Sequence, residues 1–100
     1  MIRKISLQDR SIFLTMSEEF YASPAVEHAV PHEFHVRAFD EMMRSDDYIE
    51  GFLLMDGTVP AGYALLQKTY SREAGGLTIW IDEIYLRPAF RGKGLAKAFF

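Results

Sequence analysis

The stretch from Trp80 to Phe100, WIDEIYLRPAFRGKGLAKAFF, constrains the fold more than any other part of the sequence. Its first part is apolar on both faces, which is typical of a central strand in a sheet. The apolar residues that set this pattern are Ile81, Ile84 and Leu86. Pro88 cannot join a strand ladder, so the strand is predicted to end near Arg87.

A basic, glycine-rich turn follows the strand and is predicted to open a helix at Leu95. Its residues are Arg91, Gly92, Lys93, Gly94, Leu95, Ala96 and Lys97. Glycines adopt positive φ readily and let an outside group approach the backbone amides. Free N–H groups and a positive dipole end make a helix N-terminus an anion site, and the flanking cations add charge. The turn therefore predicts a phosphate site.

Two familiar phosphate motifs do not fit this turn. A Rossmann fingerprint needs a third glycine three residues after the second, and Lys97 stands there. A P-loop needs Ser or Thr directly after Gly-Lys, and Gly94 stands there. A plain strand–turn–helix with solubilising basic residues is the remaining alternative.

Two adjacent carboxylates, Asp82 and Glu83, stand inside the apolar strand. Burying unpaired carboxylates is costly, so a strand that keeps two of them usually has a reason. A carboxylate can remove a proton from an ammonium, whose pKa is roughly 10.4, directly or through a water. Adjacent strand residues point to opposite faces, so only one of the two is expected to face a given cleft. A structural ion pair is the alternative.

Together these features resemble motif A of the GNAT superfamily, the Gcn5-related N-acetyltransferases. The family pattern is Arg or Gln, two residues, Gly, one residue, and Gly or Ala. Here it corresponds to Arg91, Gly94 and Ala96, preceded by the apolar strand and Pro88. The acidic pair before Ile84-Tyr85-Leu86 resembles the spermidine/spermine and thialysine acetyltransferase branch.

The resemblance implies roles for these residues. The backbone of Ile84, Tyr85 and Leu86 is expected to pair with the pantetheine arm of acetyl-CoA, as an added strand would. The amides from Arg91 to Lys97 are expected to hold its pyrophosphate. Asp82 is expected to act as the base and Glu83 to help hold the amine, with Glu83 as the alternative base. Because Asp82 is shorter than the Glu usual at that place, a bridging water is expected.

The expected fold is α/β (α+β), the N-terminal part of a GNAT domain in the order β-α-α-β-β-β-α. It has a mixed, mostly antiparallel sheet with flanking helices, and residues 1–100 form one domain. Hydrophobic periodicity predicts strands at 1–6, 48–55, 59–70 and 77–86, and helices at 7–21 and 32–44. Ser6 and Asp9 resemble a capping box for the first helix.

Each helix has a predicted buried stripe. In the first helix the stripe is Ile12, Met16 and Phe20, with Phe13 beside it. In the second helix it is Phe34, Ala38 and Met42.

In the resembled family a further strand, helix and strands follow motif A and complete the acetyl-CoA cleft. We therefore expect this chain to be truncated after motif A, with the family's thiolate-protonating tyrosine beyond residue 100. The fourth strand would then have an open edge prone to pair with a second copy, which leaves a homodimer open.

Composition excludes several classes of function. A net charge of −3 gives no broad basic surface, so nucleic acid is not expected as a partner. The chain has no cysteine, hence no disulfide and no thiolate nucleophile. His32 and His35 share a helix face without an evident third ligand, so no metal site is expected. No stretch reaches membrane-spanning length, and we expect a cytoplasmic protein that does not bind membranes.

The sequence is thus interpreted as an acetyl-CoA-dependent N-acetyltransferase that acts on the primary amine of a small molecule. A non-catalytic acyl-CoA binding or sensing module is the alternative. The acceptor stays open among polyamines, aminoglycosides, amino acids and protein N-termini.

Overall fold

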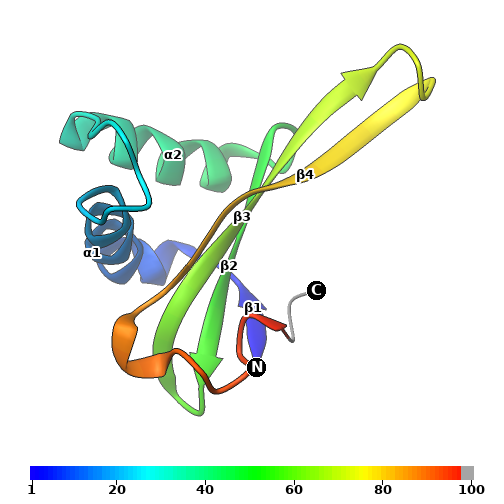
Figure 1. The fold of residues 1–100 in the computed structure, drawn as a ribbon. Helices are drawn as coiled ribbons and strands as arrows, with labels where there is room; N and C mark the ends of the chain where they lie inside the picture. The colour runs from blue at the N-terminus through cyan, green and yellow to red at the C-terminus, as the bar shows by residue number, and fades with distance from the viewer. Residues whose placement is uncertain (98–100) are drawn as a thin grey trace.

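The computed structural model describes residues 1–97, which form a four-stranded antiparallel sheet with two α-helices on one face (Figure 1). The elements are β1 (Ile2–Lys4), η1 (Leu7–Asp9), α1 (Arg10–Tyr21), α2 (His32–Arg44), β2 (Ile49–Asp56), β3 (Val59–Ser71), β4 (Gly76–Leu86) and η2 (Pro88–Phe90). This order confirms the predicted fold class. Leu95 and Ala96 lie in a turn, and most of the helix predicted from Leu95 falls outside the described residues.

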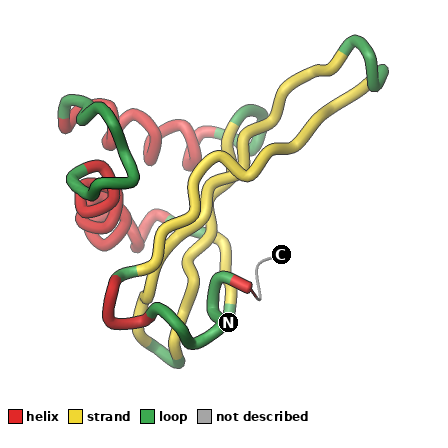
Figure 2. The backbone as a smooth tube through the Cα atoms, viewed as in Figure 1, coloured by secondary structure: helices red, strands yellow, loops and turns green. Residues whose placement is uncertain are grey.

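The strands follow one another in the order β1-β2-β3-β4, so β4 lies at an edge of the described sheet. The strand pattern had indicated a central strand, but within residues 1–97 β4 has the open edge that was also expected for this chain. Ile79, Trp80 and Ile81 are 56%, 57% and 43% exposed, because no described strand or helix covers this part of β4. The paired residues 68–79 extend beyond the helices as a hairpin arm (Figure 2).

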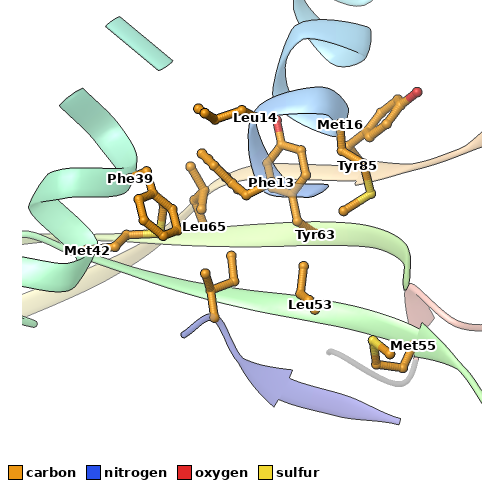
Figure 3. Packing of buried hydrophobic residues seen from close by; sticks show 11 residues of the cluster. Phe13, Leu14, Met16, Phe39, Met42, Leu53, Met55, Tyr63, Leu65 and Tyr85 are labelled. Carbon is orange, nitrogen blue, oxygen red and sulfur yellow. The ribbon is translucent and has the colours of Figure 1, made fainter. Parts of the chain in front are cut away.

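The core lies between the helices and the sheet, and aromatic rings fill its centre (Figure 3). The ring of Phe13 from α1 packs edge-on against Tyr63 from β3, with centroids 5.3 Å apart. Phe13 and Met16 are fully buried, whereas Ile12 and Phe20 are only partly buried beside them. The buried face of α1 is therefore rotated slightly from the predicted stripe.

Helix α2 buries a face that only partly matches the predicted one, because Met42 is buried as expected but Phe34 is not. His35, Phe39 and Met42 are buried, and Phe34 is 46% exposed. Both sets of residues have helical spacing, so periodicity alone could not choose between them. A buried histidine is tolerated here because Ser17 of α1 lies within hydrogen-bond distance of it, with 2.6 Å between Oγ and Nδ1.

The first helical turn is held by Asp9, as the capping-box pattern predicted. The backbone amide of Ser6 donates to Asp9 Oδ2 at 2.8 Å, and the guanidinium of Arg3 binds both carboxylate oxygens. The Arg3 hydrogen bond is the main cause that lowers the pKa of Asp9 to about 2. This buried carboxylate ties β1 to the start of α1.

We expect Asp9→Ala to lower the free energy of unfolding at neutral pH by about 1–2 kcal/mol, since it removes a cap and its charged hydrogen bonds. The folded-state pKa is depressed, so this stabilisation is present above the unfolded pKa near 3.8 and is lost as pH falls towards about 2. Urea unfolding between pH 7 and 2 should show the difference from wild type shrinking in that window. Asp40→Ala, at an exposed helix position, is the control, and a difference that does not change with pH would contradict the assignment.

Candidate active site

An irregularity in β4 places the two acidic residues. Leu65 of β3 pairs with Glu83, but the next residue, Leu66, pairs with Ile81, so Asp82 is an extra residue on β4. Such a bulge interrupts the alternation of side chains between the two faces. The expectation that only one of the two carboxylates can face a given side of the sheet is wrong for this reason. Both contribute to hollows on the side of the helices.

Glu83 lies beneath the helices and is held by two tyrosines. The hydroxyl of Tyr21, at the end of α1, donates to Glu83 Oε2 at 2.9 Å. The hydroxyl of Tyr63, on β3, donates to Oε1 at 2.8 Å. Each carboxylate oxygen therefore has a phenol donor, and the side chain is fixed from two elements.

Burial is the largest influence on the protonation of this cluster. Burial raises the pKa of Glu83, and the hydrogen bonds from Tyr63 and Tyr21 partly oppose that rise. Burial and the bond to Glu83 raise the pKa of Tyr21 to about 12 and that of Tyr63 still further. Glu83 thus binds a proton more readily than an exposed glutamate does, while both tyrosines remain hydrogen-bond donors.

A small cavity of about 130 Å³ adjoins Glu83 between α1, α2 and the sheet. Its polar lining consists of Ser17, Tyr21, His35 and Glu83. The rings of Tyr21 and His35 meet edge to face with centroids 4.9 Å apart. No buried side-chain nitrogen or oxygen within residues 1–97 lacks a hydrogen-bond partner, so this polar cluster is fully satisfied.

Asp82 faces a larger and more open hollow of about 430 Å³. This hollow lies between α2 and the sheet, and Phe34 and Ala38 also line the small cavity next to Glu83. Asp82 makes no hydrogen bond or ion pair with any part of the chain that the structure describes. Its carboxylate is exposed and available to a cation.

The end of β4 is tied to α1 by Glu19. Glu19 accepts hydrogen bonds from Arg87 Nε and Nη2, each at 3.1 Å, and from the Tyr85 hydroxyl at 3.1 Å. On the other side, Gly62 of β3 allows close approach, because a Cβ there would meet the Tyr85 carbonyl oxygen at 2.0 Å. These contacts hold the backbone of Ile84–Leu86, whose outer edge has no partner strand among the described residues.

The glycine-rich turn has the backbone conformation that the sequence predicted. Gly92 and Gly94 have φ of +84° and +75°, and a Cβ at either position would meet nothing within 4 Å. Their amides donate no hydrogen bond to the described part of the chain. The turn thus presents free N–H groups in open space, which suits an anion.

Two basic side chains of the turn contact the protein itself. Arg91 Nε donates to the carbonyl oxygen of Leu86 at 3.0 Å, and Lys93 Nζ pairs with Asp56 at 3.2 Å. Arg91 therefore fixes the turn to the end of β4. The Arg91 amide is also occupied, because it donates to the carbonyl oxygen of Pro88 at 3.3 Å, whereas the amides of Gly92 and Gly94 have no partner among the described residues.

Residues 1–97 contain no group of three or more His, Cys, Asp or Glu side chains that could hold a metal ion. In the same residues, no helix has both the length and the apolar character needed to cross a membrane.

The Acetyltransferase (GNAT) family matches residues 12–99 of the sequence. The chain belongs to the GNAT acetyltransferase family. No curated protein matches it.

Solved structures with the same fold include both uncharacterised and ligand-bound proteins. An integron cassette protein from the mobile metagenome of Cole Harbour Salt Marsh has 33% identity and a TM-score of 0.86, over 97% of this chain and 62% of that chain. AAC(6')-Iy, in complex with the bisubstrate analogue CoA-S-monomethyl-acetylneamine, has 19% identity and a TM-score of 0.77, over 98% and 64%. A predicted acetyltransferase with acetyl-CoA from Clostridium acetobutylicum has 15% identity and a TM-score of 0.77, over 99% and 67%. This GNAT chain thus spans under two thirds of the first two proteins.

The structure brings together residues that the sequence did not connect. Glu83 of the predicted pair lies with Tyr21, Tyr63 and His35, while Asp82 lines the neighbouring hollow, and neither Tyr63 nor His35 had been assigned to the site. The sequence carried one signal for these residues: each is a polar side chain on or beside a face that also carries core residues. The predicted segments 84–86 and 91–97 follow directly on β4, beyond the acidic pair.

We expect Tyr21→Phe to raise the pKa of Glu83 further. In wild type the hydrogen bond from Tyr21 stabilises the charged carboxylate, and the variant lacks that bond. Carbon-13 NMR titration of the glutamate carboxyl groups would measure this directly. Tyr70→Phe on the exposed hairpin arm is the matched control and should leave the Glu83 resonance unchanged. An unchanged titration in Tyr21→Phe would show that the phenol does not stabilise the carboxylate.

Proposed function

We propose that the protein is an acetyl-CoA-dependent N-acetyltransferase that acts on the primary amine of a small molecule. The observation that carries the proposal is a half-buried carboxylate, Glu83, immediately before a strand edge and a turn with free amides. Such an arrangement offers a proton acceptor, a surface for an extended ligand arm and an anion site in sequence along one strand. The family and the ligands named for AAC(6')-Iy and the Clostridium acetobutylicum protein support it.

Acetyl-CoA would supply the acetyl group as a thioester: the neutral amine nitrogen would bond to the carbonyl carbon, the C–S bond would break, and the leaving thiolate would take up the proton that the nitrogen loses on forming the amide. The residues of this chain would bind the amine and accept the proton of its ammonium form, so that the neutral nitrogen can attack. Glu83 suits this part, since burial raises its pKa towards the range in which a carboxylate can act as a base near neutral pH. Exposed Asp82 suits capture of the incoming ammonium. This proposal exchanges the roles that the family resemblance assigns to the two residues.

The proposed acetyl-CoA site follows the sequence-based expectation. The backbone of Ile84, Tyr85 and Leu86 would pair with the pantetheine arm along the outer edge of β4. The amides between Arg91 and Lys97 would bind the pyrophosphate, in the manner of other backbone anion sites. The open space around Gly92 and Gly94 supports this placement. A relation to the spermidine/spermine and thialysine branch stays a prediction.

Non-catalytic acyl-CoA sensing remains the second candidate. It would keep the same turn and strand edge but would use Glu83 only to join α1 to the sheet. The two hydrogen bonds from Tyr21 and Tyr63 are the specific observation in its favour, since they give Glu83 a structural role already.

Glu83→Gln separates the two candidates. If Glu83 is the base, kcat/KM should rise with pH through its raised pKa in wild type and should fall by about 100-fold or more in the variant, with that rise abolished. Steady-state acetylation of an amine panel between pH 5 and 9 would measure this. Glu73→Gln, at an exposed turn, is the matched control. Equal rates in Glu83→Gln and wild type would exclude Glu83 as the base.

We expect Gly94→Val to weaken acetyl-CoA binding on the order of a hundredfold, since two shielded amides lose charge-assisted hydrogen bonds of roughly 1.5–3 kcal/mol each. Isothermal titration would give the affinity and thermal melts the stability. Gly75→Val is a close control, because Gly75 has φ +71° and equally open surroundings but lies in the hairpin arm. Both variants strain the backbone alike, so only the anion site differs. If a folded Gly94→Val protein binds acetyl-CoA with wild-type affinity, the pyrophosphate does not bind at this turn.

A further inference from the structure

The open hollow in front of Asp82 is lined by apolar and aromatic groups on α2 and the sheet. Phe34, Tyr48 and Ile49 contribute much of this wall, and Phe34 and Tyr48 are 46% and 65% exposed. Large exposed rings gathered around a concave site usually mark a place where a partner or ligand is bound. The volume of about 430 Å³ lies in the range of small-molecule sites.

Charge is distributed unevenly over this hollow. Asp82 makes no hydrogen bond or ion pair with residues 1–97, so its negative charge is free to attract a cation. The other carboxylate, Glu41, accepts hydrogen bonds from Nε and Nη2 of Arg44 and is already neutralised. Arg37 adds a positive charge to the lining. Among the described residues that line this hollow, Asp82 is therefore the carboxylate without an ion-pair partner, and it can attract one positive charge.

The aromatic rings do not provide a second cation site either. The guanidinium carbon of Arg37 lies 5.1 Å from the Phe34 ring centroid, and that of Arg44 lies 5.8 Å from the Tyr48 centroid. One face of each ring is thus already occupied by a cation. A ligand ammonium placed near either ring would be repelled by the arginine, whereas an apolar or aromatic group could pack against the remaining ring surface.

We infer that the acceptor is a monoamine with a flat, apolar body, held with its ammonium at Asp82 and its body against Phe34 and Tyr48. This inference rests on the proposed function and narrows its acceptor class. Polyamines and aminoglycosides carry further ammonium groups, which would lie in the field of Arg37. The hollow selects against them by charge and selects for the apolar body by burial of its surface.

Steady-state acetylation with 2-phenylethylamine, spermidine and neamine tests the inference. Wild type should favour 2-phenylethylamine by about tenfold or more in kcat/KM, a ratio within the range that one pocket contact can give. Arg37→Glu should raise kcat/KM for spermidine by about threefold to tenfold at low salt, because it supplies a second anion. Arg72→Glu, the same charge change at the exposed tip of the hairpin arm, should have no such effect.

Equilibrium binding keeps this inference separate from the proposed function. Chemical-shift mapping with 2-phenylethylamine should perturb Tyr48 and Ile49 in wild type, and Asp82→Asn should weaken that binding by about tenfold. If the protein binds the monoamine there but acetylates no amine, the proposed enzymatic function is wrong, while the proposed binding of a monoamine in the hollow is supported. If it acetylates spermidine or neamine as well as 2-phenylethylamine, the enzyme stands and the inference is overturned. Absence of any shift at Tyr48 also overturns it.

Discussion

Burial of the Glu83 carboxylate is the interaction on which the rest of this structure depends. A carboxylate under two helices is costly unless each oxygen has a donor. Tyr21 and Tyr63 supply those donors from α1 and β3, so the end of the helix, the centre of the sheet and β4 are joined at one side chain. The same burial raises the pKa of Glu83, which makes a structural junction chemically useful.

The site is organised as two adjoining compartments with different properties. The small cavity beside Glu83 is enclosed by core residues, whereas the hollow beside Asp82 is open to solvent. Phe34 and Ala38 line both compartments.

Local sequence signals predicted the elements well, because each depends on nearby residues. Pro88 marked the end of β4, the glycines marked the turn, and helical spacing marked α2. The bounds of α2 are those predicted. The bulge at Asp82 could not be predicted, since Trp80–Glu83 contains no glycine or proline to mark it. The partnership of Tyr21 and Tyr63 with Glu83 depends on tertiary packing across more than one element. Which of His35 and Phe34 is buried in α2 also depends on tertiary packing.

The extra residue at Asp82 also has an evolutionary consequence. A one-codon deletion between Leu77 and Ile81 could be absorbed by closing the bulge, after which Asp82 would pair with Leu66. Glu83 would stay opposite Leu65, while Asp82 would turn to the far face of the sheet. A single small genetic event could thus remove one carboxylate from the site and leave the other in place. Relatives that differ in arm length by one residue would therefore differ in the number of carboxylates on the helix side of the sheet without any substitution at either acid.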